Sequence, residues 1–126
     1  MNSLNSQEAG VDIVRIDRFR KHVENPQFLN RVFNPSEIKA ILSHKKPEIR
    51  MAGRWAAKEA VSKAFGCGIG EKLGFKDITI TNNSNGKPIV EVDETVNAAF
   101  GFPKISLSIS HDGDYAIAFV VVHFPS

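Results

Sequence analysis

The sequence predicts a single α+β domain, in which one antiparallel sheet of about five strands packs against a long central helix and shorter helices. The length of 126 residues suits one domain, and the hydrophobic fraction of 42% is enough for one core. Strand patterns and helix patterns both occur along the chain. No internal repeat, low-complexity tract or linker divides the sequence, so we expect one domain over residues 1–126.

The first elements are marked by β-branched and capping residues. Residues 11–16, VDIVRI, are rich in β-branched side chains and predict a strand. Asp17 can cap a short basic helix over residues 17–24. A second helix is expected after Asn34, because a proline follows it and Glu37 lies three positions later, as in a capping box.

A long helix follows in the middle of the chain. Pro47 can open it, and it is expected to run through Ala64 or Phe65, because Gly66 supplies a left-handed terminator. Small apolar residues recur on one side of this segment, which favours close packing against another element.

The second half of the chain contains a hairpin, a short helix and two further strands. Residues 77–81 and 88–92 flank the pair Asn85-Gly86, which is a strong signal for a hairpin turn. The remaining helix and the two further strands are expected at residues 94–100, 104–110 and 115–124.

Composition limits the class of protein and its location. Cys67 is the only cysteine, so no disulfide can form within the chain, and the N-terminal residues lack a secretory signal pattern. The longest apolar stretch, residues 115–124, is far shorter than the ~20 residues that cross a membrane as a helix. A net charge of +2 gives no bulk indication of nucleic-acid binding. We therefore expect a cytoplasmic protein with no membrane and no nucleic acid among its partners.

Asp12 and Glu59 are the two carboxylates whose positions need an explanation. Asp12 shares a strand face with Val14 and Ile16, so its charge is expected to point toward apolar surroundings and to need a cation or a metal. The alternative is an edge strand on which Asp12 faces water. Glu59 lies four residues before Lys63 on one helix face, and the simplest interpretation is an exposed ion pair that stabilises the helix by about 0.2 to 0.5 kcal/mol.

Two further features suit either a structural or a functional interpretation. His111 and Asp112 end a strand beside a turn, where side chains often line a cleft, but His111 also shares the face of apolar residues and suits a core histidine. The glycines of GCGIG, residues 66–70, would let a backbone approach a phosphate, although they match neither a P-loop nor a dinucleotide fingerprint.

Four motifs occur in a fixed order along the chain. They are GVDIVRI from Gly10, RWAAKEAVSKAFGCGIG from Arg54, NGKP from Asn85 and SISHD from Ser108. Together they closely resemble the holo-acyl-carrier-protein synthase group of 4'-phosphopantetheinyl transferases. The resemblance spans residues 10 to about 122, which form the expected core of the domain.

The resemblance implies a Mg²⁺-dependent reaction of fatty-acid biosynthesis: transfer of the phosphopantetheine arm of coenzyme A to a serine of an apo acyl carrier protein, with release of adenosine 3',5'-bisphosphate. It assigns Asp12 and Glu59 to the Mg²⁺ that bridges the pyrophosphate, and Glu59 to deprotonation of the serine, directly or through water. Lys63 completes the implied catalytic set, and Arg54 suits the ribose 3'-phosphate. The implied coenzyme A contacts are Arg54, Lys58, Lys63, Gly66, Asn85, Gly86, Lys87, Pro88 and His111.

The resemblance also implies protein partners. It implies a homotrimer with active sites at the subunit interfaces, to which a neighbouring subunit contributes the NGKP turn. An acidic carrier protein would dock on a basic surface, for which the matching residues are Arg18, Lys21, Phe28 and Arg31. Phe28 suits a core position equally well. The chain departs from the usual family pattern at Glu8, Gln27, Trp55 and Cys67.

Two functions of other classes remain open. A nucleic-acid-binding module would use Arg54, Lys58 and Lys63 to follow phosphates, but no aromatic-rich binding sheet accompanies them. A catalytically silent relative would bind coenzyme A or a carrier protein without turnover. The presence of both carboxylates and the lysine argues against the silent relative.

Overall fold

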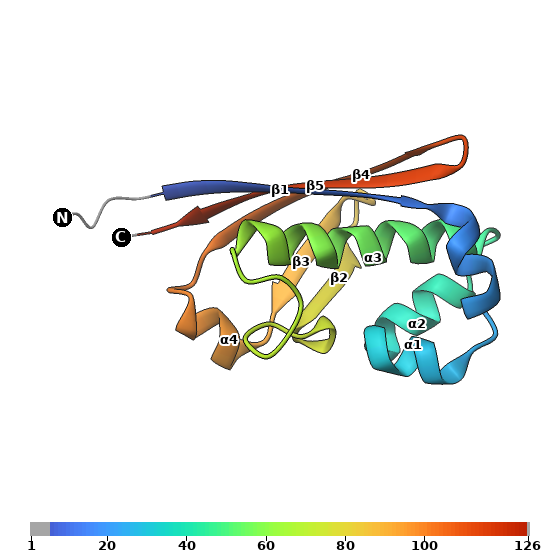
Figure 1. Ribbon diagram of the computed structural model, residues 1–126, viewed down its shortest axis with the longest axis horizontal. Coiled ribbons are helices and arrows are strands. Elements are labelled where there is room, and N and C mark those ends of the chain that lie inside the picture. The colour runs from blue at the N-terminus through green and yellow to red at the C-terminus, as the bar shows by residue number, and fades with distance from the viewer. Residues whose placement is uncertain (1–5, 126) are drawn as a thin grey trace.

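The computed structural model describes residues 6–125, which form five strands, four α-helices and two 3-10 helices (Figure 1). In chain order the elements are β1 (Ser6–Arg15), the 3-10 helix η1 (Ile16–His22), α1 (Pro26–Val32), α2 (Pro35–Leu42), α3 (Pro47–Ala64), the 3-10 helix η2 (Phe75–Asp77), β2 (Ile78–Asn82), β3 (Pro88–Val92), α4 (Glu94–Ala99), β4 (Lys104–Asp112) and β5 (Tyr115–Phe124). The predicted α+β class is confirmed. None of the helices within these residues is long and apolar enough to cross a bilayer.

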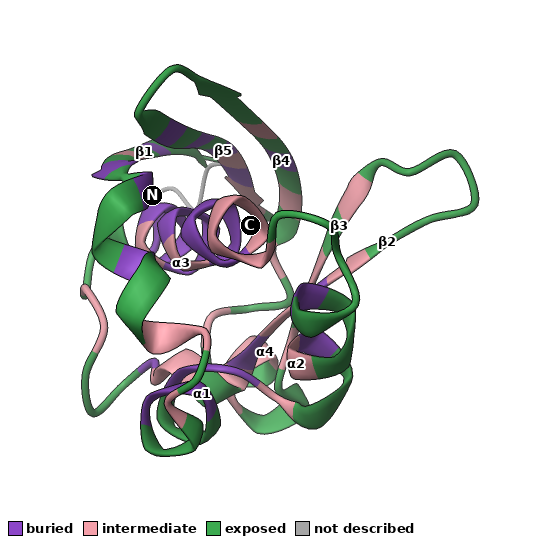
Figure 2. Ribbon diagram, turned by 90° about the vertical axis from the view of Figure 1, so that its right-hand side faces the viewer, coloured by how far each residue is buried: buried purple, intermediate pink, exposed green. Residues whose placement is uncertain are grey.

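The five strands form two antiparallel sheets instead of the single sheet that we expect from the sequence. β5 lies between β1 and β4 in a three-stranded sheet, and β2 pairs with β3 alone. Figure 2 shows the β2–β3 hairpin projecting away from the three-stranded sheet. A strand pattern identifies the strands, but the pairing of strands that are not joined by a turn depends on packing between distant parts of the chain.

Helix α3 runs along the inner face of the three-stranded sheet (Figure 1). β1 and α3 approach so closely that a Cβ atom on Gly10 would overlap the carbonyl oxygen of Ala60 and lie 3.0 Å from the backbone nitrogen of Ala64. The two backbones are therefore in direct contact at this point, and only glycine fits there. The expected end of the helix is also confirmed, because Gly66 has a φ of +81°.

The expected capping residues are only partly confirmed. Helix α2 begins after Asn34, and the backbone nitrogen of Asn34 donates a hydrogen bond to Glu37 Oε1 at 2.8 Å. Asp17, however, is not an N-cap: it lies inside η1 and pairs with Arg20 at 2.7 Å. The residue before η1 is Arg15, whose side chain makes no capping hydrogen bond.

Helix α1 lies outside the elements that we expect from the sequence, although its signal is present. Asn25 precedes a proline, as Asn34 does, and Asn25 Oδ1 accepts a hydrogen bond from the backbone nitrogen of Phe28 at 3.2 Å. The helix has only seven residues, so its apolar period is too short to stand out.

An aromatic cluster fills the space between η1, α1 and α3. Phe19 and Phe28 are buried, and Trp55 packs between them at centroid distances of 5.7 and 5.9 Å. The ring of His22 stacks on Phe28 at 3.7 Å with an interplanar angle of 9°. Burial lowers the pKa of His22, and the charges of Lys21, Arg18 and Arg31 lower it further. Folding therefore favours the neutral form of this imidazole.

We expect the free energy of unfolding to decrease as the pH falls below about 6.5, because His22 takes up a proton there in the unfolded chain but not yet in the folded one. The loss ends once the pH lies below the folded-state pKa. His22→Phe should remove this contribution. Urea denaturation near pH 7.5 and pH 5.5 should therefore show a smaller loss for the variant. Equal losses in both proteins would contradict the assigned direction of the shift.

Candidate active site

Asp12 and Lys63 join β1 to α3. Asp12 lies on the inner side of β1 between the buried residues Gly10 and Val14, as expected from the strand pattern. Its Oδ1 accepts a hydrogen bond from Lys63 Nζ at 2.9 Å, and Lys63 Nζ also donates to the carbonyl oxygen of Val11 at 3.0 Å. The side chain of Asp12 is only 15% exposed. Its Oδ2 is buried and has no hydrogen-bond partner among residues 6–125.

Glu59 brings a second carboxylate to the same place, one helical turn before Lys63. Burial raises the pKa of Glu59 and the charge of Asp12 raises it further, whereas Lys63 and Arg18 lower it. The exposed ion pair between Glu59 and Lys63 that is the simplest sequence interpretation does not form, because Lys63 binds Asp12 instead. Lys63 therefore donates its side-chain hydrogen bond to Asp12 and acts on Glu59 only through its charge.

This arrangement suits a hard divalent cation. Carboxylate oxygens are preferred ligands of Mg²⁺, and the buried Oδ2 of Asp12 has no hydrogen-bond partner among the described residues. Within the described part of the chain, no group of three or more His, Cys, Asp or Glu side chains could hold a metal. A cation at Asp12 and Glu59 would therefore need further ligands from substrate or water.

A cavity of about 230 Å³ forms the second part of the candidate site. It lies between the first half of α3, the β2–β3 hairpin and the end of β4, and its lining contains no acidic side chain. Four of the positions that the family resemblance assigns to coenzyme A line it: Arg54, Gly86, Pro88 and His111. His111 is exposed on this cavity, so it is not a core histidine. The other lining residues are His44, Ile49, Arg50, Gly53, Asn82 and Ile109.

Asn82 organises the basic side of this cavity. Its Oδ1 accepts hydrogen bonds from Arg54 Nη2 and, at 3.3 Å, from Arg50 Nη1. Its Nδ2 donates to the carbonyl oxygen of Gly86 at 2.9 Å, which ties the hairpin turn to α3. Arg50 and Asn82 are absent from the sequence-based set. Arg50 lies four residues before Arg54, so both lie on one helix face. This spacing is the sequence signal that indicates Arg50 as a further site residue.

Arg54 is a buried guanidinium with capacity left for a ligand. Burial, and to a lesser extent the charge of Arg50, lowers the pKa of Arg54 to about 10. This value is still well above neutral pH, so the guanidinium remains charged there. Its Nε is buried without a hydrogen-bond partner among the described residues. A cavity with two guanidiniums, two histidines and no carboxylate suits a phosphate group.

Lys58 does not take the role that the family resemblance assigns to it. Its side chain is fully buried, and Nζ donates to Glu37 Oε1 at 2.8 Å and to the carbonyl oxygens of Val32 and Phe75 at 2.9 Å. All three protons of the ammonium group are used inside the protein. The expectation that Lys58 contacts coenzyme A is therefore wrong in this structure.

The expected docking surface is basic, but Phe28 is not part of it. Arg18, Lys21 and Arg31 are exposed on η1 and α1. Phe28 is only 7% exposed and lies between His22 and Trp55, so it belongs to the core. The charge of Arg18 lowers the pKa of Glu59, so the expected docking surface lies near the carboxylates.

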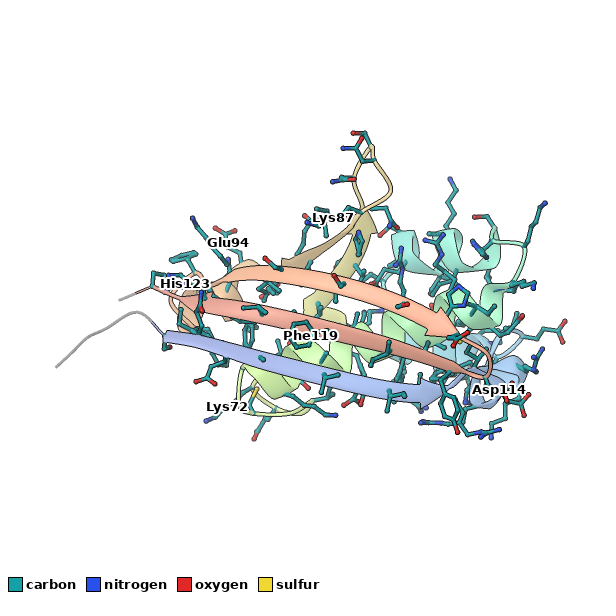
Figure 3. All side chains as sticks on the ribbon, turned by 90° about the horizontal axis from the view of Figure 1, so that it is seen from above. Lys72, Lys87, Glu94, Asp114, Phe119 and His123 are labelled. Atoms are coloured by element: carbon teal, nitrogen blue, oxygen red, sulfur yellow. The ribbon has the colours of Figure 1, made fainter. Side chains whose placement is uncertain are left out.

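The remaining predicted coenzyme contacts lie at the surface. Gly66 is exposed at the end of α3. Asn85 and Lys87 are exposed in the turn between β2 and β3, where their backbone nitrogens donate to Asn83 Oδ1. Figure 3 shows Lys87 on the projecting hairpin. None of these three lines the cavity.

The two parts of the site face different directions on one chain. Arg54 and Glu59 are five residues apart on α3, which corresponds to a rotation of about 140° around the helix axis. The cavity and the carboxylates therefore cannot meet around one small region of a single chain. They could act on one ligand if two copies of the chain faced each other.

The chain is similar to known proteins over most of its length. Residues 8–120 match the 4'-phosphopantetheinyl transferase superfamily. The chain is 45% identical over 117 residues to the holo-[acyl-carrier-protein] synthase of Chlorobaculum parvum, covering 91% of this chain and 97% of the relative. It is 42% identical over 114 residues to the same enzyme of Protochlamydia amoebophila, covering 89% of this chain and 93% of the relative.

Solved structures give the same result. The Helicobacter pylori holo-[acyl-carrier-protein] synthase in complex with coenzyme A superposes with a TM-score of 0.83 at 39% identity, over 90% of this chain and 98% of that chain. A Bacillus anthracis holo-(acyl-carrier-protein) synthase in complex with CoA (3',5'-ADP) superposes with a TM-score of 0.79 at 35% identity, over 94% of this chain and 96% of that chain. With both its sequence and its fold matched over nearly the full length, the chain belongs to the 4'-phosphopantetheinyl transferase superfamily.

Proposed function

We propose that this protein is a holo-acyl-carrier-protein synthase. It transfers the 4'-phosphopantetheine group of coenzyme A to a serine of an apo acyl carrier protein and releases adenosine 3',5'-bisphosphate. The observation that carries the proposal is the carboxylate pair of Asp12 and Glu59, which lies beside Lys63 and leaves one buried oxygen without a partner. Relatives with 42% and 45% identity over most of their length carry this name.

Coenzyme A presents a ribose 3'-phosphate and a pyrophosphate, and the two parts of the site suit these two groups. Arg54 is the proposed partner of the 3'-phosphate, because its buried Nε is a free donor and a guanidinium can bind a phosphate through two hydrogen bonds. His111, Gly86 and Pro88 line the same cavity. Lys63 lies at the carboxylates and is the proposed partner of the pyrophosphate.

Asp12 and Glu59 are the residues that would hold Mg²⁺. Mg²⁺ is commonly bound by one or two carboxylates together with substrate phosphates, so two proposed protein ligands are enough. The unpaired Oδ2 of Asp12 fits this role. When bound, the ion supplies positive charge that neutralises the pyrophosphate during the transfer.

Glu59 is the proposed general base. Its pKa is raised, first by burial, which makes it a better proton acceptor than an ordinary glutamate. The serine oxygen forms a bond to the phosphorus nearer the pantetheine arm, and the bond from that phosphorus to the bridging oxygen breaks. The serine proton passes to Glu59, directly or through water, and the adenosine product leaves with the bridging oxygen. Lys63 neutralises charge on the leaving group, so no covalent enzyme intermediate is needed.

We further propose that the active protein is a homotrimer in which neighbouring copies bring the two parts of the site together. The rotation of about 140° between Arg54 and Glu59 supports this arrangement, because one copy can offer the cavity and the next copy the carboxylates. The outer face of the three-stranded sheet also exposes apolar side chains, among them Val11, Ile13, Ile117 and Phe119. Figure 3 shows Phe119 on this face, which other copies would cover.

Phe119→Asp is expected to convert the trimer into a monomer of 13.9 kDa and to abolish transfer, because a charge would be buried between copies. Analytical ultracentrifugation measures the mass, and circular dichroism checks that the variant is folded. Leu42→Asp is the matched control: Leu42 is 45% exposed and Phe119 48%, but Leu42 lies on α2. A monomeric unchanged protein with full activity would contradict the proposed assembly.

Arg18→Glu is expected to raise the KM for apo acyl carrier protein by at least ~10-fold and to leave the affinity for coenzyme A nearly unchanged. The reason is that Arg18 is exposed on η1, where an acidic partner would meet it first. Steady-state kinetics gives the KM, and calorimetry gives the affinity for coenzyme A. Arg20→Glu serves as a control on the same 3-10 helix, because Arg20 is already paired with Asp17 and should matter less. Equal losses for both substrates would show that Arg18 is a structural residue.

Mass spectrometry of an apo acyl carrier protein tests the proposed reaction directly. The carrier is incubated with the protein, coenzyme A and Mg²⁺, and a parallel sample contains EDTA. A mass gain equal to one phosphopantetheinyl group, which EDTA prevents, is the expected result. No gain with several carriers, from protein shown to be folded, would favour a silent relative that only binds coenzyme A or a carrier.

A further inference from the structure

Arg18 differs from the other arginine of η1 in what holds it. Arg20 Nε pairs with Asp17 Oδ1 at 2.7 Å. The Arg18 guanidinium has neither a hydrogen bond nor an ion pair within residues 6–125, but its Cζ lies 5.3 Å from the ring centroid of Phe19 and 5.6 Å from that of Trp55. Aromatic faces attract cations at such distances. Two aromatic rings are therefore the direct contacts that hold this exposed guanidinium, and the charge of Glu59 acts on it without forming an ion pair.

Trp55 is itself fixed by the aromatic cluster. Its ring packs at 4.8 Å from Phe75, at 5.7 Å from Phe19 and at 5.9 Å from Phe28, the last with an interplanar angle of 20°. These neighbours come from three different elements. A ring held on several sides offers a rigid surface, so a guanidinium placed on it loses less freedom on binding a partner.

The position of Trp55 on α3 gives this contact a direction. Trp55 precedes Glu59 by four residues, so both side chains lie on one face of the helix. A guanidinium on the Trp55 ring therefore lies between the basic docking surface and the carboxylates of the site. The same cluster also carries Arg31, whose Cζ lies 5.9 Å from the ring centroid of Phe28.

We infer that Trp55 is a positioning residue for Arg18: its ring holds the guanidinium at the junction of the docking surface and the carboxylate site, and it thereby governs use of the acidic carrier rather than of coenzyme A. This inference rests on the proposed function. Because the carrier contacts a preplaced charge, the aromatic cluster acts on the acceptor side of the reaction. The coenzyme cavity lies on another face of α3 and does not include Trp55.

A double-mutant cycle tests the inference, because it separates an effect through Arg18 from an effect of Trp55 alone. The four proteins are the unchanged chain, Trp55→Leu, Arg18→Ala and the double variant. We expect Trp55→Leu to raise the carrier KM by about 2- to 30-fold, the range of a cation–π contact, with the KM for coenzyme A unchanged. Trp55→Phe, which keeps an aromatic ring, should show a much smaller rise of the carrier KM than Trp55→Leu. In the Arg18→Ala background, Trp55→Leu should have no further effect.

Other outcomes would overturn the inference. An equal rise of the carrier KM in both backgrounds would mean that Trp55 contacts the carrier itself or only supports the fold. A rise of the KM for coenzyme A as large as that for the carrier would also point to a general packing defect. All of these outcomes require that the unchanged protein is active. If the unchanged protein transfers no phosphopantetheine, the proposed function itself fails, so the two failures can be told apart.

A spectroscopic measurement covers the case in which Trp55→Leu does not fold. Trp55 is the only tryptophan in the chain, so its emission reports its own surroundings. We expect Arg18→Ala to change this emission, and Arg20→Ala to leave it as in the unchanged protein, because Arg20 pairs with Asp17 instead. Apo carrier, added without coenzyme A, should change the emission of the unchanged protein and not that of Arg18→Ala. Identical spectra for all three proteins, with and without carrier, would refute the contact.

Discussion

Replacing Glu59 by glutamine is expected to lower the rate of phosphopantetheine transfer by about 10²- to 10⁴-fold, because glutamine keeps the shape of the side chain but cannot accept the serine proton. Asp12→Asn should be similarly harmful, because it removes charge from the buried oxygen that we assign to Mg²⁺ and takes an ionic partner from Lys63. Initial rates from mass spectrometry of the carrier measure both effects.

The two carboxylate variants should differ in their response to Mg²⁺. A higher Mg²⁺ concentration should recover part of the activity of Asp12→Asn, since a weaker site can still be filled, but less of the activity of Glu59→Gln, which also lacks the base. Glu71→Gln, at an exposed carboxylate beyond α3, should be as active as the unchanged protein. Near-normal transfer by Glu59→Gln at saturating Mg²⁺ would remove Glu59 from the mechanism.

The largest expected effect on stability comes from Lys58→Met. This change leaves Glu37 fully buried with no cation to pair with its charge, which destabilises proteins by about 3 to 5 kcal/mol. The Glu37 carboxylate also accepts hydrogen bonds from the backbone nitrogens of Asn34 and Ile80. An unpaired charge on Glu37 would therefore destabilise both the start of α2 and strand β2. Urea denaturation, followed by circular dichroism, measures the change in the free energy of unfolding.

A second substitution distinguishes a lost pair from lost packing. Lys58→Met combined with Glu37→Leu should recover part of the stability, because no unpaired charge then remains in the core. Lys39→Met, at an exposed lysine of α2, should change the free energy of unfolding by no more than about 0.5 kcal/mol. If Lys58→Met is as mild as Lys39→Met, the buried ion pair contributes little to the free energy of unfolding.

Lys58 and Glu59 show how far the sequence predicts this site. They are neighbours in one motif, yet their side chains leave α3 about 100° apart, so one enters the core and the other faces Asp12. The helix and its ends follow from local residues, namely Pro47 and Gly66. Which face is covered depends on α2 and β2, whose contacts with α3 lie far apart in the sequence, and no local pattern contains that information.

Asn82 illustrates a second limit. The Asn85-Gly86 pair correctly predicts the hairpin, because turn chemistry is local. Asn82 ends β2 as an ordinary polar residue, and its importance appears only when the fold brings it to Arg50 and Arg54. The sequence does not predict the division of the strands into two sheets, because that division also depends on contacts between distant parts of the chain. Local signals indicate elements, whereas partners of elements depend on the assembled chain.

The contact between Gly10 and Ala60 sets the distance between β1 and α3 beside the proposed metal ligands through backbone atoms, with no side chain between them. Asp12 lies two residues after Gly10 and Glu59 one residue before Ala60, so both carboxylates are carried by the point where two backbones touch. We expect that core side chains that do not pack between β1 and α3 can be exchanged without moving this contact. A library of core substitutions distant from Gly10 should therefore yield variants that melt earlier but catalyse normally while folded, so that heat resistance and turnover can be engineered separately in this enzyme.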